Sequence, residues 1–386
     1  MLLQSFCAVN YRNIENAVLH FEPGVNLLFG ANAQGKTNVL EGIYTFARGK
    51  SFRGAVDEEQ VRFGEKGFSI EIGFHSDGRD QTLSYRYYDG SRRRQKNGAP
   101  IKGRADMIGH FRAVLFYPEH LQLVKGGPAE RRLFLNIAIS QLNAEYLHLL
   151  SRYETVLGNR NSLLRTAQKT GYFDREQFSV WNAAMAELCA DIALVRRDYI
   201  ARLGDVAGGI MHDMTGGRET LSLAYLSDDG GRRSPVSDQT GAPCDDETAK
   251  KAERERLIDL YTDTLSASLP RECAAGCSLY GIHRDDMRIL LCGTDARTFA
   301  SQGQQRSAVL ALKLAEGELS FRESGEYPVF LFDDVLSELD EERRAFVLAG
   351  AKDKQMIMTA CERGGVEESA ASVTEVRGGT YDPTHR

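Results

Sequence analysis

The residues with the clearest chemical potential form a glycine-rich stretch near the N-terminus. Residues 30–37 read GANAQGKT, which matches the phosphate-binding pattern G-x-x-x-x-G-K-[ST]. In that pattern, glycines let backbone N–H groups wrap the phosphates of a nucleotide. Lys36 would neutralise charge on the β- and γ-phosphates, and the hydroxyl of Thr37 would bind Mg²⁺. The alternative is a glycine-rich turn ahead of an ordinary helix.

The sequence on either side of this stretch provides the setting that phosphate binding requires. The apolar run 25–29 predicts a strand before the loop, and an amphipathic pattern over about 36–47 predicts a helix after it. A strand–loop–helix unit of this kind is where the motif binds nucleotide phosphates. The residues that we expect around the phosphates are Gly30, Ala31, Asn32, Ala33, Gln34, Gly35, Lys36, Thr37 and Asn38.

Two adjacent carboxylates could complete the metal site. Residues 328–340 read PVFLFDDVLSELD, an apolar, strand-like run that ends in Asp333 and Asp334. At the end of a buried parallel strand, Asp333 would hold Mg²⁺, and Asp334 would orient or deprotonate the attacking water. Neighbouring carboxylates are tolerable beside a compensating cation, which Mg²⁺ and Lys36 would supply. The alternative is a solvated helix N-terminus, where aspartate is favoured.

A third stretch, SQGQQRSAVLALKLAE at residues 301–316, joins a polar loop to an apolar helix. A helix that is apolar nearly all round is normally buried. Its N-terminus offers free N–H groups and a favourable dipole to an anion. Ser301, Gly303 and Gln304 are therefore candidate anion contacts, although Ser301 could instead serve only as a helix N-cap.

Composition is that of an ordinary soluble protein. The chain has 386 residues, 42% hydrophobic and 26% charged, which is enough for a large core and for two domains or one split domain. Seven scattered cysteines and an N-terminus without a signal-peptide pattern predict reduced thiols and a cytoplasmic location. No run approaches the roughly 18 apolar residues of a membrane helix, so we expect no membrane association. The net charge of −6 excludes a uniformly basic DNA-coating protein, but not a local basic surface.

The pattern along the chain predicts an α/β domain interrupted by a helical insertion. Strands are expected over 1–30, and an antiparallel pair over 68–74 and 81–88. A polar loop at 226–247 is expected to be mobile. The helical patterns run over 128–169, 174–203 and 247–269, and the expected division is 1–120, 121–275 and 276–386, with the first and last parts forming one domain.

The three motifs together resemble an ABC-type P-loop ATPase of the SMC-like branch. SQGQQ (301–305) stands in the place of the signature motif, and SELD (337–340) in that of the D-loop. The resemblance implies an ATPase head, formed by 1–120 and 276–386, whose mixed sheet includes antiparallel strands and which is interrupted by a mainly helical second lobe. It also implies that the signature loop meets the γ-phosphate of ATP bound by a second subunit, so that ATP is sandwiched in a homodimer.

Five longer blocks of the chain are GKTNVLEGIYTFARGKSFRG (35–54), PEHLQLVKGGPAERRLFLN (118–136), GIHRDD (281–286), FASQGQQR (299–306) and LFDDVLSELD (331–340). Together they resemble the RecF family in particular. The resemblance implies a cytoplasmic ATPase with ATP and Mg²⁺ as cofactors, which binds DNA at single-strand gaps or junctions and also duplex DNA. It implies action with RecO and RecR to load RecA, and thus a part in DNA repair, replication restart and the SOS response. By the same analogy, Arg12 in NYRN (10–13) is a candidate nucleotide contact.

The chain departs from the general ABC pattern at three points. Gln302 and Gln304 flank a single Gly303 where the signature usually has two glycines. Asp334 stands where glutamate is usual, although this substitution is itself a feature of the RecF group. Thr359 is found where a switch histidine is expected. Because a shorter base should position water less well, we expect a weak ATPase whose slow hydrolysis acts as a release timer.

Two groups of basic residues are candidates for DNA contact. One follows a tyrosine-rich strand, and the other follows the predicted P-loop helix. Such clusters suit phosphate contacts whose affinity falls with salt, and the alternative is a solvated hairpin. His283 in GIHRDD could contact nucleotide or DNA, or be structural. The basic residues are Arg92, Arg93, Arg94, Lys96, Lys102 and Arg104 in the first group, and Arg48, Lys50 and Arg53 in the second.

Two other functions are compatible with the nucleotide motifs. The first is an SMC-like ATPase subunit of a nuclease or defence system, which would need a nuclease or TOPRIM-type block for which no separate domain is evident. The second is a helical adaptor with a vestigial nucleotide site, against which the intact sets Gly35-Lys36-Thr37 and Asp333-Asp334 argue. The helical arm is too short for a long SMC coiled coil, and we expect a compact lobe that closes over DNA.

Overall fold

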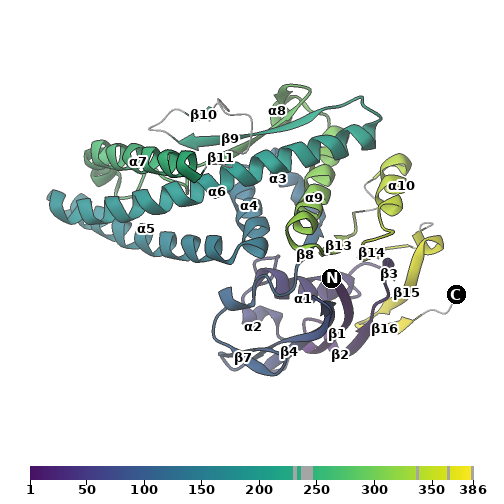
Figure 1. Cartoon of the computed structure of the whole chain (residues 1–386). Coiled ribbons are helices and arrows are strands. Elements are labelled where there is room, and N and C mark those ends of the chain that lie inside the picture. Colours follow the sequence, from purple (N-terminus) through teal and green to yellow (C-terminus); the bar gives the residue numbers. More distant parts are fainter. Residues whose placement is uncertain (229–232, 236–246, 336–338, 363–365, 384–386) are drawn as a thin grey trace. The chain divides into compact units, whose positions relative to one another are not determined.

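A computed structural model of the chain describes residues 1–228, 233–235, 247–335, 339–362 and 366–383 (Figure 1). The chain forms two compact units. Unit 1 comprises Met1–Leu121, Gly209–Arg218 and Gln302–Arg386, and unit 2 comprises Gln122–Gly208 and Glu219–Ser301. Unit 1 is therefore built from both ends of the chain.

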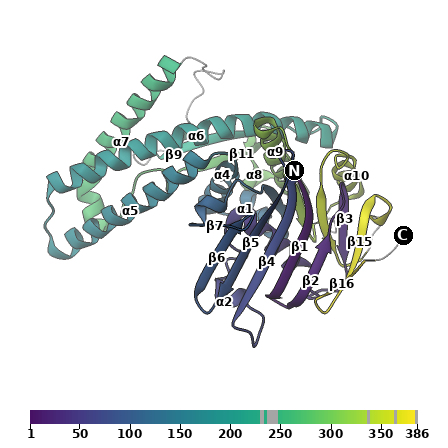
Figure 2. The same cartoon turned by 60° about the horizontal axis from the view of Figure 1, so that its bottom comes forward.

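Unit 1 contains a six-stranded antiparallel sheet (Figure 2). In sheet order its strands are β2 (Ile14–His20), β1 (Leu2–Tyr11), β4 (Gly67–Ser76), β5 (Arg79–Tyr88), β6 (Ser91–Lys96) and β7 (Ala99–Ile101). Burial alternates along β1 and β4, because one face of the sheet packs on the core. β4 and β5 pair along their whole length, which confirms the antiparallel pair predicted over 68–74 and 81–88.

The second sheet of unit 1 carries the nucleotide motifs. Its strands, in order, are β16 (Thr380–Pro383), β15 (Ala370–Arg377), β3 (Val25–Phe29), β14 (Met356–Ala360), β13 (Val329–Asp333) and β8 (Ala113–Phe116). All pairs are parallel except β15 with β16. β3, β14 and β13 are almost completely buried, as parallel strands covered on both faces should be. Their carboxyl ends lie at one edge, so the residues that follow β3 and β13 meet there.

Helices cover this sheet within unit 1. α1 (Lys36–Arg48) packs on β13, β14 and β8, and α9 (Gln302–Ser324) packs on β8. α9 is buried over most of its length, which confirms the prediction of a buried helix after the polar stretch. The shorter helices of unit 1 are α2 (Asp57–Gln60), η1 (Ala105–Met107), η2 (Pro118–Leu121), α10 (Glu341–Ala349) and η4 (Val366–Glu368).

Unit 2 is mainly helical and also contains a small sheet. Long helices α5 and α7 pack on each other, and α4 packs on β11 of the sheet. The helices are α3 (Gln122–Lys125), α4 (Pro128–Leu142), α5 (Ala144–Thr170), α6 (Arg175–Thr215), α7 (Glu247–Ala275) and α8 (Ala296–Phe299). The part of α6 from Gly209 onward belongs to unit 1. The strands, in sheet order, are β10 (Arg233–Pro235), β9 (Leu221–Asp228), β11 (Asp286–Leu291) and β12 (Thr294–Asp295). The mixed sheet of unit 1 and the mainly helical unit 2 confirm the predicted α/β class.

Several predicted boundaries need correction. Residues 276–301, expected in the head, group with unit 2 because β11 pairs antiparallel with β9. The expected loop at 226–247 includes the end of β9 and all of β10, and its positions 229–232 and 236–246 lie outside the described residues. α7 continues past Pro270, where the helical pattern was expected to end.

α6 also differs from expectation. It has 41 residues and extends twelve residues beyond the predicted end at 203. By length and composition it is long and apolar enough to cross a membrane, contrary to the prediction that no run is. One such helix is weak evidence for a membrane span, and half of its most apolar 18-residue stretch is buried inside the protein.

Candidate nucleotide-binding site

The glycine-rich loop lies between the buried strand β3 and helix α1. Its last residue, Gly35, is the N-cap of α1 with φ 113°, and no side chain caps the N–H groups of the first turn. These groups and the helix dipole therefore favour an anion at this point. Lys36 is buried, and its Nζ donates hydrogen bonds to the carbonyl oxygens of Gly30 at 2.6 Å and Ala31 at 2.8 Å. The ammonium is thus fixed at the loop where phosphates would bind.

The predicted metal ligands Thr37 and Asp333 are in contact. The hydroxyl of Thr37 donates to Oδ1 of Asp333 at 2.8 Å, across 296 residues of sequence. Thr359 on β14 donates to the same oxygen at 2.8 Å. Burial of Asp333 raises the pKa of its carboxyl, and the hydrogen bonds from Thr359 and Thr37 oppose that change. Two hydroxyls therefore keep a carboxylate oxygen oriented at the end of β13.

Asp334 follows in a conformation that is uncommon for a non-glycine residue. Its φ is 54°, and its N–H donates to the hydroxyl of Thr359 at 2.9 Å. Strained backbone of this kind is concentrated at functional sites. Thr359 thus connects both acidic residues, a role that its place in the sequence did not reveal.

Cys361, directly after β14, is a site residue that the sequence analysis missed. Its thiol lies 2.8 Å from Oδ1 of Asn32 in the loop and 3.8 and 3.9 Å from the carboxylate oxygens of Asp334. Burial, and then the charge of Asp334, raise the pKa of the Cys361 thiol. The protonated thiol can donate a weak hydrogen bond toward these oxygens. Its position at the end of a parallel strand was the signal available in the sequence.

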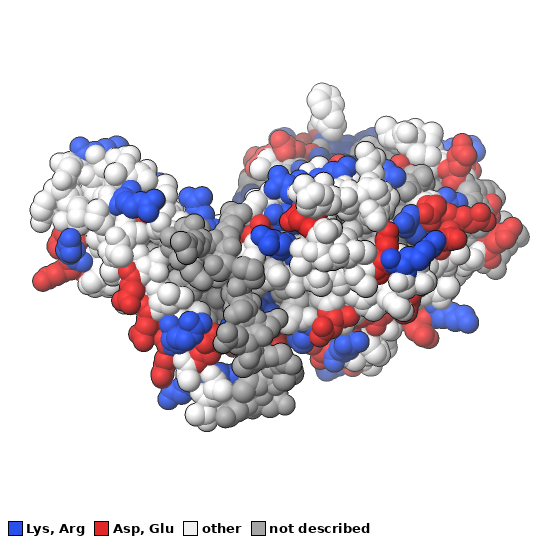
Figure 3. All heavy atoms as spheres, turned by 90° about the horizontal axis from the view of Figure 1, so that it is seen from above, with Lys and Arg blue, Asp and Glu red and all other residues white. Residues whose placement is uncertain are grey.

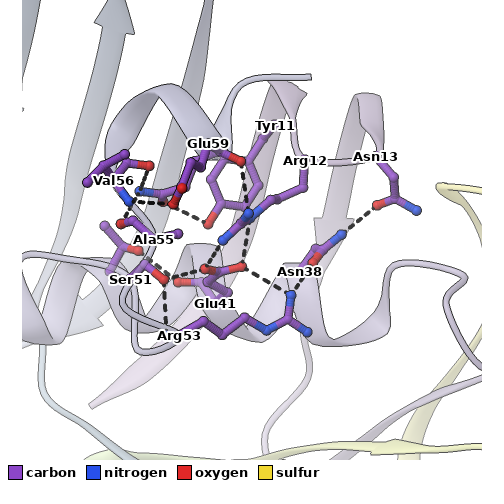
Figure 4. Close-up of polar contacts among 12 residues, drawn as sticks. Tyr11, Arg12, Asn13, Asn38, Glu41, Ser51, Arg53, Ala55, Val56 and Glu59 are labelled. Atoms are coloured by element: carbon purple, nitrogen blue, oxygen red, sulfur yellow. Dashed lines mark hydrogen bonds and ion pairs between the residues drawn. The ribbon is translucent and has the colours of Figure 1, made fainter. Parts of the chain in front are cut away.

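Arg12 and Arg53 meet on the buried carboxylate of Glu41, which lies on α1 (Figure 4). Arg12 donates to both oxygens of Glu41, at 2.6 and 3.1 Å, and to the carbonyl of Glu59 at 2.8 Å. Arg53 donates to Oδ1 of Asn38 at 3.1 Å, and its Nη1 lies 3.6 Å from Glu41. These contacts assign both arginines to the support of the P-loop helix. Contact of Arg12 with nucleotide remains a prediction.

The signature stretch begins at the boundary between the units. Ser301 is exposed and is the last residue of unit 2, and Gln302 begins α9 in unit 1. Gly303 and Gln304 are half-buried in the first turn, where the carbonyl of Gly303 accepts a hydrogen bond from Ser307 at 3.0 Å. In the D-loop stretch, residues 336–338 lie outside the described residues. Asp340 is the N-cap of α10.

The GIHRDD turn is a structural element of unit 2. Asp286 accepts two hydrogen bonds from Arg131, at 2.7 and 3.0 Å, and both residues are buried. Arg196 donates to the carbonyl of Ile282 at 2.7 Å and lies 3.5 Å from Asp285. Buried ion pairs of this kind are strongly destabilising to break.

His283, in the same turn, is held on both sides of its ring. Nδ1 lies 2.6 Å from the hydroxyl of Tyr153, and Nε2 lies 3.2 Å from the carbonyl of Ser278. A carbonyl can only accept, so Nε2 carries the proton and Tyr153 donates to Nδ1. The structural alternative for this histidine is therefore the one that the geometry favours.

We expect His283 to make the stability of the chain depend on pH. Burial lowers the pKa of His283 to about 4, from an ordinary value of 6.5. Between these values the unfolded state binds more protons than the folded state. The contribution of His283 to the free energy of unfolding is therefore fully present well above pH 6.5 and is lost as the pH falls toward 4. The loss corresponds to about 2 kcal/mol at pH 5. Urea unfolding at pH 7 and pH 5 measures it.

His283→Gln should remove that part of the pH dependence. His20→Gln, at an exposed position on β2, is the matched control and should keep the wild-type behaviour. Equal pH dependence in His283→Gln and wild type would contradict the assignment.

The predicted basic hairpin divides into two faces. Arg92 and Arg94 pack over the rings of Tyr87 and Tyr85, with guanidinium-to-centroid distances of 5.8 and 4.6 Å, and Arg92 also donates to Asp57. Arg93 is exposed on the opposite face. Figure 3 shows another face of the molecule, seen from above the view of Figure 1, on which Lys and Arg are interspersed with Asp and Glu. Arg94 is half-buried, whereas Arg92 and Arg93 are both exposed, each on its own face of the sheet.

The other basic candidates have separate environments. Lys102 and Arg104 are exposed, as is Lys50 in the second group. Nζ of Lys96 lies 3.0 Å from Nδ1 of His110. Arg48, at the end of α1, donates to the carbonyl of Ser51 at 3.3 Å.

The chain is similar to proteins of one family over almost its whole length. The family model described as RecF/RecN/SMC N terminal domain matches residues 2–380. The DNA replication and repair protein RecF of Geobacillus thermodenitrificans (strain NG80-2) is 36% identical over 368 residues, 95% of this chain and 94% of that protein. The protein of that name from Staphylococcus carnosus (strain TM300) is 38% identical over 377 residues, 95% of each chain.

Solved structures agree with this likeness. A structure described as the recombination mediator protein RecF-ATP in the RecFOR pathway has a TM-score of 0.86 and 32% identity, and the match covers 100% of this chain and 98% of that one. An SMC head bound to the C-winged helix domain of ScpA has a TM-score of 0.56 and 13% identity, with coverage of 100% and 97%. The second likeness concerns the fold alone.

Proposed function

Because this chain belongs to the RecF family, we propose that it is an ATP-dependent DNA-binding protein of recombinational gap repair and replication restart. The observation that carries the proposal is the contact of Thr37 with Asp333 at 2.8 Å beside the P-loop. It joins the two motifs that a P-loop ATPase needs for phosphate and metal. RecF relatives are DNA replication and repair proteins by name, and one solved relative is described with ATP.

The residues at the site fit ATP with Mg²⁺. Mg²⁺ prefers oxygen ligands, and the hydroxyl of Thr37 and the carboxylate of Asp333 supply two that already face each other. Lys36 and the N–H groups at the start of α1 would bind the phosphates, with Gly30 to Asn38 as the surrounding loop. When bound, Mg²⁺ would neutralise charge on the phosphates during hydrolysis.

Asp334 is the proposed base or orienting group for the attacking water. Its carboxylate is held near Asn32 of the P-loop through Cys361, and its backbone is fixed by Thr359. The side chain is one methylene shorter than glutamate, so we propose slow hydrolysis that times release. Steady-state turnover above about 10 per second, a typical enzyme median, would contradict the timer.

We further propose that ATP joins two copies of the chain. Ser301, Gly303 and Gln304 would meet the γ-phosphate of ATP on the partner's P-loop. The exposure of Ser301 supports a contact outside its own chain. The dimer would bind DNA at single-strand gaps or junctions, or on duplex, and act with RecO and RecR to load RecA.

DNA binding by the head is expected to use the exposed arginines of the antiparallel sheet. Arg86 and Arg93 are cross-strand partners and both are exposed. Replacing both by glutamine should weaken DNA binding and lower the slope of log affinity against log salt by about 2. Titrations of labelled gapped DNA at several salt concentrations measure the slope.

Arg92→Gln is the matched control for this experiment. Its guanidinium packs on Tyr87 and pairs with Asp57, so its loss should lower stability and leave the salt slope unchanged. An unchanged slope in the Arg86, Arg93 double variant would exclude this face as a DNA contact.

The nuclease or defence alternative gains no support from the described residues. Within them, no group of three or more His, Cys, Asp or Glu side chains is arranged to hold a metal ion. We therefore advance no second function.

A further inference from the structure

The carbonyl groups of the P-loop need hydrogen-bond partners of their own. A loop whose N–H groups turn toward an anion turns its C=O groups away from it, and buried carbonyls require donors. Lys36 supplies the donors for Gly30 and Ala31. The N–H groups of Asn38 and Val39 donate to the carbonyl of Gly35. The carbonyl of Gln34 has no donor among these, and its partners come from elsewhere in unit 1.

The turn between β15 and β16 supplies those partners. The N–H of Gly379 donates to the carbonyl of Gln34 at 3.0 Å, and the N–H of Gly378 donates to Oε1 of the same residue at 2.5 Å. The hydroxyl of Tyr381 donates to the carbonyl of Gly35 at 3.3 Å. Burial raises the pKa of Tyr381, so its hydroxyl keeps the proton that it donates. Three residues of one hairpin thus contact two consecutive P-loop residues.

The β1–β2 turn closes the arrangement from the other side. Nδ2 of Asn13 donates to the carbonyl of Gln34 at 3.0 Å, and Oδ1 of Asn13 accepts from Asn38 of α1 at 2.7 Å. β16 also lies beside β2, so the two turns are neighbours (Figure 2). The P-loop is therefore held between two turns that are more than 360 residues apart in the sequence.

The spacing between these segments leaves no room for a side chain at Gly379. Its φ is 85°, and a Cβ there would lie 2.7 Å from the carbonyl oxygen of Asn13. A Cβ at Gly35 would lie 2.8 Å from Oδ1 of Asn13 and 3.1 Å from the hydroxyl of Tyr381. Glycine is required at such close backbone approaches. The turn is shaped to fit against the loop.

We propose that Gly378, Gly379 and Tyr381 are positioning residues for ATP: the β15–β16 turn holds the P-loop in the conformation that binds phosphate. The inference rests on the proposed function in one respect, namely that this loop binds ATP. It adds that the affinity for ATP is set by a hairpin that would not itself touch the nucleotide.

The first test compares two tyrosine variants. Tyr381→Phe removes the hydroxyl that contacts Gly35 and leaves the ring in place. Tyr88→Phe, at an exposed position on β5, is the matched control. We expect Tyr381→Phe to bind ATP about threefold to tenfold more weakly, as the loss of one hydrogen bond predicts, and Tyr88→Phe to bind it normally. Turnover at saturating ATP should be unchanged, because the loss affects ground state and transition state alike.

The second test compares two glycine variants. Gly379→Ala and Gly90→Ala both place a side chain at positive φ, 85° and 81°. A Cβ at Gly90 has no atom within 4 Å, whereas a Cβ at Gly379 meets Asn13. Both should lower the unfolding temperature without nucleotide, and Gly379→Ala should lower it more, because its Cβ also meets the Asn13 carbonyl. Only Gly379→Ala should lose ATP affinity, by about tenfold or more.

The outcomes separate this inference from the proposed function. If wild-type protein fails to bind ATP, the proposed function fails. If wild type binds ATP and both Tyr381→Phe and Gly379→Ala bind it equally well, the hairpin does not position the loop and the inference is overturned. An affinity loss in Gly90→Ala equal to that in Gly379→Ala would also overturn it, because the loss would then follow stability alone.

Discussion

The Lys36→Met variant should bind ATP at least about 30-fold more weakly than wild type and show no measurable hydrolysis. Removing one partner of a buried, hydrogen-bonded charge pair costs about 2–5 kcal/mol of binding free energy. Here the pair would be the Lys36 ammonium and the β- and γ-phosphates of ATP. Methionine has a similar length and suits a buried position, so the fold should survive. Equilibrium binding of a fluorescent ATP analogue measures the loss.

Lys66→Met is the control for that experiment, because Lys66 is an exposed lysine of the same unit. It should bind ATP as wild type does. Wild-type affinity in Lys36→Met would mean that the phosphates bind somewhere other than the GANAQGKT loop.

Replacing Asp334 by asparagine should separate binding from hydrolysis. We expect ATP affinity to stay near wild type and turnover to fall about 100-fold or more, the usual contribution of a general base. Asparagine tolerates the positive φ of 54° at this position, so the backbone should be kept. Phosphate release under saturating ATP gives the rate.

Asp353→Asn, at an exposed position in unit 1, is the matched control for Asp334→Asn and should hydrolyse ATP normally. If Asp334→Asn retains the wild-type rate, the water is activated by another group, and our assignment of the second acidic residue is wrong.

The core of the candidate site was predictable because it depends on local patterns. Val25–Phe29, the glycine-rich loop and the helix after it form a unit that sequence alone reveals. The apolar run before Asp333 indicated a buried strand, and neighbouring parallel strands have their carboxyl ends at the same edge of a sheet. Thr37 and Asp333 were therefore expected at one metal site, and the structure places them in contact. The resemblance to the RecF family is confirmed by proteins of that name that are 36% and 38% identical over 95% of this chain.

The supporting residues could not be predicted, because their roles arise from packing between distant segments. Cys361 and Thr359 become site residues only because β14 lies between β3 and β13. Asn13 and Tyr381 contact the P-loop through turns at opposite ends of the chain. The sequence pointed to Thr359 only as the residue in place of a switch histidine, and it did not indicate the hydrogen bonds that any of the four makes.

Other sequence signals were present but pointed to more than one structure. In SRRRQK, the cross-strand register places Arg92 and Arg94 over tyrosines and leaves Arg93 on the other face. GIHRDD contains residues that could act in catalysis or binding, yet Asp286 forms a buried ion pair with Arg131 inside unit 2. Burial favours a structural role for GIHRDD, and burial depends on the tertiary fold. For the hairpin, contact with DNA stays a prediction.

The central claim is that the SQGQQ stretch of one chain contacts ATP bound to a second chain. The mass of the protein in solution tests this claim most directly. Light scattering should be recorded for wild type, Lys36→Met and Ser301→Arg, each with ATP, with ADP and without nucleotide. We predict a dimer for wild type with ATP only, and monomers for both variants under every condition. A wild-type monomer in the presence of ATP, or an ATP-dependent dimer of Ser301→Arg, would contradict the claim.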